Sequence, residues 1–348
     1  MKNIAYFLIG AALLVSSLAS ATIRTVSNHA LGGSQYSTLQ AAYDASSAGD
    51  TLIVEGTITA YTLSGYTKSL VWIGSGLYTQ KQNMLQTQFS KASSGAGSAS
   101  SWYIQSGASG SKFYGINFVG GTNTSNVLSI GTSNIHFENC LFDRKVTVAA
   151  GNVVFRNCIF TDINSVTISG SINDIMFSNC IFNYGIIGGG ITQSVAFDHC
   201  LFLSTGTCFS ACDGFEVNNS IFMNSTGVSG ITNSAFENNL TRLSMTFPPA
   251  GNIDNGGQVI GSDPLFANYV NDALFSSAHD YHLQGGSPAL AAATDGTEIG
   301  LHGGYTNFSE TGEVLIVPVV RSMNVPNSNA PVGGIINVEV SASKPTDN

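Results

Sequence analysis

The charged side chains of this chain are few, and the densest group of them lies around one short stretch. His136 and Glu138 stand two residues apart, and Arg156 follows one repeat later. An acid, a base and a cation held together could abstract a proton beside the carboxylate of a uronic acid, or hydrolyse a glycosidic bond. The alternative, which we favour, is an ordinary surface ion pair between Glu138 and Arg156 of small energetic value. The candidate catalytic residues are His136, Glu138 and Arg156, and the candidate binding residues are Asp143, Arg144, Lys145 and Asp198.

The elements that must position these residues come from an internal repeat of about twenty residues. Its pattern is apolar-x-Phe-x-Asn-Cys-aliphatic-Phe, and its copies begin at Asn134, Asn152, Asp174, Ser194, Gly214 and, more loosely, Ser234. β-Branched and aromatic runs separated by Gly, Ser, Asn or Thr at this period indicate a β-solenoid. A leucine-rich repeat would need a leucine ladder and a helical segment, and a propeller blade would need about twice the length.

The alternation within the repeat assigns each side chain to the inside or the outside. One inward column is Phe137, Phe155, Phe177, Phe197, Val217 and Phe236, and another is Phe142, Phe160, Phe182, Phe202 and Phe222. Coils of a solenoid stack at the strand spacing of about 4.8 Å, so like residues should touch like residues.

The position before the cysteine marks a bend in every coil, and it is occupied by Asn139, Asn157, Asn179, His199, Asn219 and Asn238. Asn tolerates the left-handed backbone of a tight bend. Its amide can also hydrogen-bond the next Asn along the axis. His199 interrupts this ladder, and we favour a turn histidine that makes the same bonds over a functional one.

The six cysteines separate into a column and a pair. Four of them, Cys140, Cys158, Cys180 and Cys200, point the same way from stacked strands, where a disulfide dihedral is hard to reach. We expect these to be buried free thiols. Cys208 and Cys212 are the better disulfide candidates, and the sequence leaves their state open.

The position after the cysteine predicts an apolar stripe on the outside of the solenoid. It carries Leu141, Ile159, Ile181, Leu201 and Ile221. Soluble monomers rarely expose such a patch. We therefore expect a cover from the C-terminal tail, from a second copy of the chain or from a loop; the alternative is that the strand alternation drifts and partly buries these residues.

The Asn ladder and the inward aromatic stacks resemble the right-handed parallel β-helices of the pectate-lyase-like superfamily. Residues 36–56 resemble its N-terminal cap, a short helix whose Leu39, Ala42 and Tyr43 cover the open end of the core before the first strand. Residues 263–269 and 280–304 resemble the closing segment of secreted bacterial β-helix proteins. The resemblance covers roughly residues 35–304 and implies an all-β right-handed parallel β-helix of about ten coils. It implies no single function, because the architecture hosts lyases, hydrolases, esterases, adhesins and phage spikes.

The catalytic motifs of known β-helix enzymes are incomplete in this chain. Of the polygalacturonase segments Asn-Thr-Asp, Asp-Asp, His-Gly and Arg-Ile-Lys, it contains His302-Gly303 alone. The pectate-lyase pattern Arg-x-Pro-x-x-Arg and the paired aspartates of pectin methylesterases in their usual setting are missing. No His or Cys spacing predicts zinc. Lyases of the superfamily often use calcium, but no Asp-rich loop predicts it here, so we expect no cofactor.

Charge and the N-terminus bear on partners and location. Only 9% of residues are charged, with a formal net charge of −9, which disfavours nucleic acid, anionic lipid and polyanionic sugars unless a local basic patch overrides it. Lys2, the apolar run Ile4–Leu18 and Ala19-Ser20-Ala21 are typical of a signal peptide cleaved after Ala21. The run is short for a membrane anchor, so we expect a secreted or extracellular-surface protein without a transmembrane anchor.

The sequence therefore predicts three parts: a signal peptide at 1–21, a β-helix at 22–304 and a tail at 305–348 with two strands, 313–320 and 334–342. Residues 90–112, rich in Ser, Gly and Ala, should form a surface loop. We expect non-catalytic binding of carbohydrate or of a cell-surface partner, with self-association or tail docking through the apolar stripe. The alternative is a polysaccharide lyase or glycoside hydrolase acting on the outer face of the helix.

Overall fold

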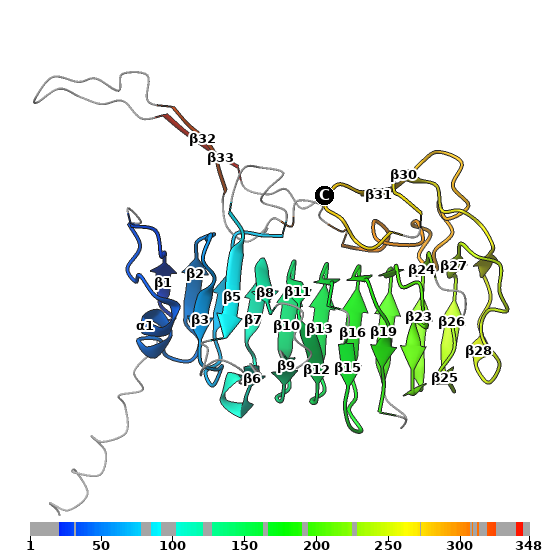
Figure 1. Ribbon diagram of the computed structural model, residues 1–348, viewed down its shortest axis with the longest axis horizontal. Helices are drawn as coiled ribbons and strands as arrows, with labels where there is room; N and C mark the ends of the chain where they lie inside the picture. The colour runs from blue at the N-terminus through cyan, green and yellow to red at the C-terminus, as the bar shows by residue number, and fades with distance from the viewer. Residues whose placement is uncertain are drawn as a thin grey trace, which may run out of the picture.

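The computed structural model describes residues 21–348 except 31–32, 78–84, 92–101, 121–126, 163–165, 190–193, 225–227, 272, 307, 309–311, 313–318, 325–338 and 344–348. Apart from Ala21, the expected signal peptide lies outside the described residues. The chain winds into an all-β parallel solenoid of about nine turns, one fewer than expected. Figure 1 shows these turns side by side along the long axis.

Two parallel sheets run the length of the solenoid, and a third parallel sheet of six strands covers its middle turns. The first sheet contains β1 (Ile23–Val26), β2 (Thr51–Val54), β4 (Val71–Ile73), β7 (Lys112–Tyr114), β10 (Ile135–Glu138), β13 (Val153–Arg156), β16 (Ile175–Ser178), β19 (Val195–Asp198), β23 (Phe215–Asn218), β26 (Ala235–Glu237) and β28 (Ile253–Asp254). The second sheet contains β3 (Tyr61–Leu63), β5 (Thr87–Lys91), β8 (Ile116–Val119), β11 (Leu141–Asp143), β14 (Ile159–Phe160), β17 (Ile181–Phe182), β20 (Leu201–Phe202), β24 (Ile221–Phe222), β27 (Leu240–Thr241) and β29 (Val259–Ile260). The third sheet contains β6 (Trp102–Ile104), β9 (Val127–Ile130), β12 (Lys145–Val148), β15 (Val166–Ile168), β18 (Ile186–Ile187) and β21 (Phe209–Ser210).

Three shorter pairings complete the described structure. Strands β22 (Cys212–Asp213) and β25 (Ile231–Thr232) pair in parallel, while β30 (Phe266–Asn268) pairs antiparallel with β31 (Asp280–Leu283). In the tail, β32 (Val319–Asn324) and β33 (Glu339–Ser343) form an antiparallel hairpin. They overlap only the ends of the two predicted strands, because residues 313–318 and 334–338 lie outside the described residues. The expected loop at 90–112 is partly wrong, because β6 begins with the fully buried Trp102 and is followed by the 3-10 turn η2 (Ser106–Ala108).

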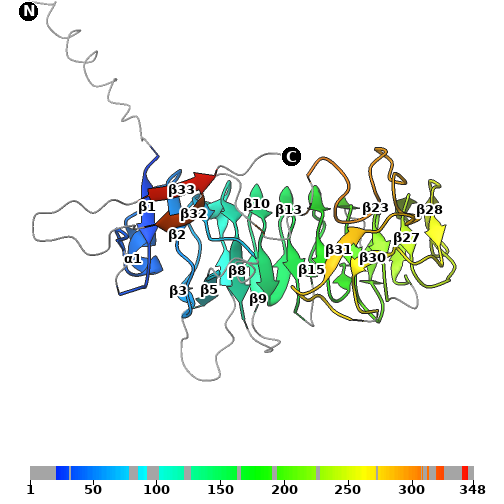
Figure 2. The same cartoon turned by 90° about the horizontal axis from the view of Figure 1, so that it is seen from above.

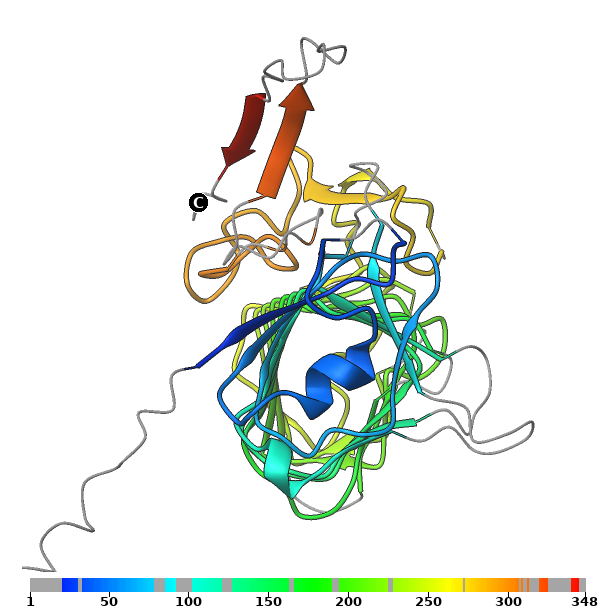
Figure 3. The same ribbon diagram turned by 90° about the vertical axis from the view of Figure 1, so that its left-hand side faces the viewer.

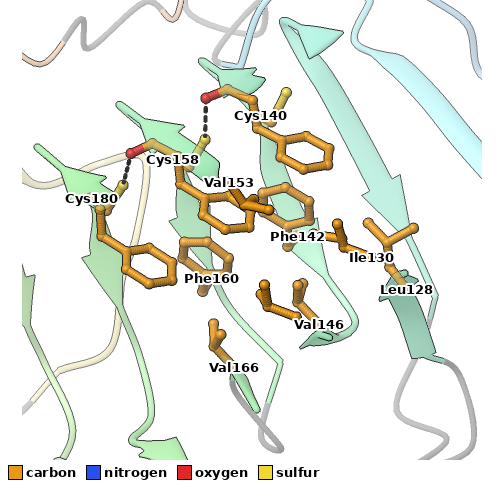
Figure 4. Close-up of a cluster of buried hydrophobic side chains, with 14 of the residues drawn as sticks. Leu128, Ile130, Cys140, Phe142, Val146, Val153, Cys158, Phe160, Val166 and Cys180 are labelled. Atoms are coloured by element: carbon orange, nitrogen blue, oxygen red, sulfur yellow. Dashed lines mark hydrogen bonds between the residues drawn. The ribbon is translucent and has the colours of Figure 1, made fainter. Parts of the chain in front are cut away.

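The inward columns predicted from the repeat are confirmed. Phe137, Phe155 and Phe177 lie opposite one another in register, are fully buried, and stack nearly parallel at ring centroid distances of 5.1 and 4.8 Å. The second column, on the second sheet, repeats this geometry, with Phe142 and Phe160 at 4.9 Å (Figure 4). Burying each such ring stabilises the fold by roughly 1.5–3 kcal/mol relative to leaving it exposed.

The bends before the cysteines are left-handed, as the Asn ladder predicts. Asn139, Asn157, Asn179, His199, Asn219 and Asn238 have φ angles between 49° and 52°. Asn adopts this conformation more readily than most residues because its short side chain can hydrogen-bond locally. Asn134, Asn152, Asp174 and Asn233 add a second left-handed corner at the start of the repeat, with φ of 50–62°.

Both ends of the core are closed by the chain itself. The short helix α1 (Leu39–Asp44) is capped by the Thr38 hydroxyl and buries Leu39, Ala42 and Tyr43, as predicted. Figure 3 shows this helix lying across the N-terminal opening of the solenoid. At the opposite end Phe247 packs against Phe222 and Phe236, at ring centroid distances of 5.4 and 5.2 Å.

No disulfide joins any of the six cysteines, all of which are described and buried. In the column, Cys158 Sγ donates to the carbonyl of Phe137 and Cys180 Sγ to that of Phe155, at 3.6 and 3.5 Å (Figure 4). Cys208 and Cys212 do not form the disulfide that their spacing suggested. Burial raises the pKa of the Cys212 thiol to about 11.

The outer apolar stripe is covered by the chain's own residues 263–308, named here the closing segment. Ile159, Ile181, Leu201 and Ile221 are fully buried in a second cluster outside the solenoid core, and Leu141 is partly buried there. The covering side chains are Phe266, Tyr281, Ala289, Ala293, Ile299, Leu301 and Phe308. Figure 2 shows β30 and β31 of this segment lying along the C-terminal half of the solenoid. The strand alternation therefore does not drift, and the stripe offers no exposed aliphatic face for self-association.

Candidate functional site

The predicted catalytic residues share one outer face of the first sheet. His136 and Glu138 project from β10, and Glu138 lies in register with Arg156 on β13. The same row continues through Ser178 to Asp198 on β19. Parallel pairing in register brings these residues together, since each inward Phe of the repeat leaves its neighbours pointing outward.

The contacts within this face differ from the expected ion pair. His136 Nε2 lies 2.9 Å from Glu138 Oε2, and no ion pair forms between Glu138 and Arg156 among the described residues. Arg156 Nε is buried without a hydrogen-bond partner there. Residues that lie opposite each other in a parallel pair need not have their charged ends in contact. Here the Glu138 carboxylate contacts His136 on its own strand and not Arg156 on the next one.

Tyr114 is the aromatic member of this face. It lies in register with Glu138, and its ring is 5.7 Å from that of His136, tilted by 47°. Burial raises the pKa of Tyr114, the Glu138 charge raises it further, and Arg156 lowers it. The face therefore gathers an acid–imidazole pair, a phenol and a guanidinium within three adjacent strands.

The predicted binding residues are not brought together. Asp143, Arg144 and Lys145 span the corner from the second to the third sheet, so consecutive side chains point in different directions. Asp143 is exposed and accepts a hydrogen bond from the Thr161 hydroxyl at 3.3 Å. Lys145 stands on the outer face of the third sheet. Because these residues lie on the second and third sheets, they do not extend the face around Glu138, which lies on the first sheet.

The prediction that Arg144 is a binding residue on the surface is wrong, because its side chain is buried. It is only 2% exposed, and its guanidinium lies 4.5 Å from the centre of the Trp102 ring. Burial lowers the pKa of this guanidinium, while Tyr66, Asp162 and Asp143 act against that shift. Its neighbours in sequence carry charges outward, but the corner turns Arg144 inward, where stacking on Trp102 compensates part of its desolvation.

The third sheet carries a row of hydroxyl groups, interrupted by Ile187, that the repeat did not predict. Successive register partners on its outer face are Tyr103, Ser129, Thr147, Thr167, Ile187 and Ser210. Tyr103, at one end, is 51% exposed, and Lys145 stands on the same strand as Thr147. The row lies outside the Phe-Asn-Cys segment, in the variable part of the repeat, so its signal was only a Ser or Thr flanked by buried aliphatics.

The closing segment occupies the bend next to Asp198. Asn179 Nδ2 donates to the carbonyls of Leu301 and Gly303, both at 2.9 Å, and Asn238 Nδ2 donates to that of Ala292 at 2.7 Å. These amides therefore bond across to the closing segment, and not to the next Asn along the axis as expected. Asp198 belongs to this junction, because its Oδ1 accepts from Asn219 Nδ2 at 2.8 Å.

In the part of the chain that the structure describes, no three His, Cys, Asp or Glu side chains are grouped so that they could hold a metal ion. The described residues also include no helix with the length and apolar character of a membrane span.

Comparison with known proteins gives no relative from which a role could be transferred. No protein-family model matches this chain, and the curated proteins include none that matches it. The candidate sites therefore depend on geometry alone.

Proposed function

We propose that the protein is exported, belongs to the pectate-lyase-like superfamily, and binds a neutral polysaccharide without cleaving it. The single observation that carries this proposal is the row of hydroxyls on the outer face of the third sheet, ending at the exposed ring of Tyr103. The signal-peptide pattern, the left-handed Asn corners and the capping helix support the export and the superfamily.

The row suits a linear neutral polymer for three reasons. From Tyr103 through Ser129 to Thr147 hydroxyls repeat at the strand spacing of about 4.8 Å, so donors and acceptors recur along this part of the axis. Beyond it the Thr167 hydroxyl is buried and Ile187 interrupts the row. Tyr103 offers an aromatic surface with a polar tip, which is suited to the apolar face of a sugar ring. The row itself carries no carboxylate, and Lys145 adds a donor beside Thr147.

Affinity electrophoresis or calorimetry of the mature chain, with neutral and acidic soluble polysaccharides in parallel, tests this. We expect binding to a neutral polymer, weakened about three- to tenfold by Tyr103→Ala, as loss of one stacking contact predicts. Thr147→Val, which removes one hydroxyl from the row, should weaken it less. Tyr305→Ala removes another exposed ring, 98% accessible and on the closing segment, and serves as the matched control. Binding that Tyr103→Ala and Tyr305→Ala change equally would contradict the site.

A second candidate function is supported by the face of the first sheet. The contact of 2.9 Å between His136 and Glu138 provides a base oriented by an acid, and Arg156, with Nε unpartnered among the described residues, could pair with a uronate carboxylate. This arrangement fits a polysaccharide lyase, or a glycoside hydrolase acting at the same place.

The enzyme alternative is tested by incubating the chain with acidic and neutral polysaccharides. Unsaturated products, detected by ultraviolet absorbance, would indicate a lyase, and new reducing ends without them a hydrolase. Either signal should disappear in His136→Ala and Arg156→Ala and persist in Met176→Ala, a neighbouring exposed position on the same face. Turnover that survives both substitutions would exclude this site.

A further inference from the structure

His199 is the one ionisable side chain in the Asn ladder, and it lies under the closing segment. It keeps the left-handed backbone of the other ladder residues, with φ of 52°, and its side chain is 2% exposed. The backbone of Gly303 and Gly304 packs against its ring, where a Cβ on Gly303 would lie 2.7 Å from Nε2. The neighbouring ladder residues, Asn179 and Asn219, bond to the closing segment through their side-chain amides. At the position between them, the His199 imidazole replaces such an amide.

The hydrogen bonds around Thr297 determine where protons must lie. Thr297 Oγ1 is 2.6 Å from Asp295 Oδ1, accepts from the Gly304 N–H at 2.8 Å, and lies 3.3 Å from His199 Nε2. Burial would raise the pKa of Asp295, but hydrogen bonds from the hydroxyl and backbone of Thr297 and the nearby His199 hold it below its ordinary value. Asp295 is therefore a carboxylate, and the proton in the contact of 2.6 Å belongs to Thr297. A hydroxyl has one proton, so Nε2 must donate to Thr297 Oγ1.

The other ring nitrogen faces a second carboxylate. His199 Nδ1 lies 3.0 Å from Asp198 Oδ1, an ion-pair contact whose geometry is not that of a hydrogen bond. A neutral ring protonated on Nε2 would direct the lone pair of Nδ1 toward this anion inside a buried junction, which is unfavourable. Both nitrogens therefore carry protons.

Among the described residues, the titratable groups on this side of His199 are acids and the imidazoles of His282 and His302, which stack on each other at a ring centroid distance of 3.8 Å. Asp198 is on the ladder side, Asp295 on the closing segment lies 3.9 Å from Nε2, and both side chains keep partial exposure, 35% and 26%. Burial raises the pKa of Glu298, whereas the nearby His282 and His199 lower it. No Lys or Arg is in ion-pair contact with these carboxylates among the described residues. One positive charge on His199 is therefore the counter-charge for this junction.

We propose that His199 is an imidazolium that joins the solenoid to the closing segment, and that this junction loosens when the ring loses its proton. Deprotonation leaves Asp198 and Asp295 facing a neutral ring and removes either the donor to Thr297 or the charge opposite Asp198. Docking is then strongest where the ring carries both protons, and it weakens as rising pH removes one of them. The closing segment covers the apolar stripe, so its loosening uncovers Ile181 and Leu201. This inference does not depend on the ligand proposed above.

The protonation state is tested first, on the unaltered chain. Long-range ¹H–¹⁵N spectra of histidine-labelled protein should place both His199 nitrogens in the protonated range at pH 6. A neutral His199 at that pH, while the closing segment remains docked, would overturn the proposal.

The coupling to docking is tested by hydrogen exchange of residues 295–304, corrected for the intrinsic rate at each pH. The Gly300 N–H donates to the Asn219 carbonyl, so its protection reports docking directly. We expect protection in the native chain to fall at least about fivefold between pH 6 and 8.5, the effect of one ion pair worth about 1 kcal/mol. His199→Asn restores the ladder residue without a titrating group, and its protection should be independent of pH. His29→Asn, at the other end of the solenoid, should behave as the native chain. An unchanged pH dependence in His199→Asn would refute the coupling.

Discussion

The two halves of the solenoid, residues 22–156 and 157–304, are alike inside and different outside. The same Phe and Cys columns cross the boundary without a change of register. Over the whole sequence of each half, the first has eight Lys or Arg and five Asp or Glu, a net charge of +3, whereas the second has one basic and twelve acidic residues, a net charge of −11. The closing segment covers the ladder of the second half from Asn179 onward. The repeat thus conserves what holds the coil together, and the outer surface is where the two halves have diverged.

The reactivity of buried thiols tests whether the interiors of the two halves are equally well packed. The change in labelling rate on unfolding is the largest effect that we expect. With a pKa of about 11, about one Cys212 in a thousand is a thiolate at pH 8, against about one in four in an unfolded chain. We expect labelling by a chromogenic disulfide reagent to accelerate at least about 200-fold on unfolding, and native labelling to rise about tenfold per pH unit up to pH 11. Cys140, in the first half and fully buried, should also label slowly. Rapid native labelling of either, located by mass spectrometry, would mean that one half opens independently.

The covered stripe should distinguish the outer surfaces of the solenoid. Ile181→Ala, under the closing segment, is expected to lower the free energy of unfolding by about 2–5 kcal/mol, because it leaves a cavity between two packed layers. Met176→Ala, on the uncovered face of the preceding strand, should change it by no more than about 0.5 kcal/mol. Urea unfolding of both variants measures the difference. Equal effects would show that the closing segment is not packed on the stripe in solution.

Substitutions in the Asn ladder should change the free energy of unfolding less than Ile181→Ala does. Asn219 exchanges hydrogen bonds with Thr294, of 2.9 Å from Nδ2 and 2.8 Å to Oδ1, and also donates to Asp198. Asn219→Gly keeps the left-handed backbone accessible and removes these bonds, so we expect a loss of about 1–3 kcal/mol in urea unfolding. Asn219→Ala should cost about 1 kcal/mol more, because Ala is strained at this φ. Asn218→Ala, next to it, is the control and should be nearly neutral. A neutral Asn219→Gly would mean that the junction contributes no stability.

The charge contrast should give the smallest effect. Glu216→Gln removes one exposed acid from the acidic half and should stabilise the chain by a few tenths of a kcal/mol at low salt, through reduced self-repulsion. Lys112→Gln, in the first half, whose net charge is smaller in magnitude, should be neutral or slightly destabilising. Thermal unfolding in low and high salt measures both, and the gain from Glu216→Gln should shrink with added salt. A salt-independent effect would exclude a role for the charge imbalance.

The inside of the fold could be predicted because every constraint on it recurs. The spacing of Phe137 and Phe142 determines a period, a face and a partner one repeat away, and the structure keeps all three. The N-terminal helix was also predictable, since Leu39, Ala42 and Tyr43 share one side.

The outside was harder because it depends on corners and on distant parts of the chain. Arg144 follows the second-sheet strand, and nothing in its neighbours reveals that the corner directs it toward Trp102. The bonds of Asn179 reach residues more than 120 positions away, so the repeat alone suggested bonding along the axis. The second left-handed corner had a local signal, the Asn or Asp that starts several copies, and could have been predicted from it.

The reach of the closing segment has a consequence for biosynthesis. Phe308 packs in the same cluster as Ile159, and the Leu77 N–H donates to the Gly312 carbonyl at 3.3 Å, so Phe308 and Gly312 lie against turns synthesised long before them. A chain emerging from its N-terminus can build its coils one after another, because each coil needs only its predecessor. The aliphatic side chains of the outer stripe then remain exposed to solvent until the closing segment has been synthesised. The interval between the first coil and the closing segment is when this protein would most need protection from aggregation.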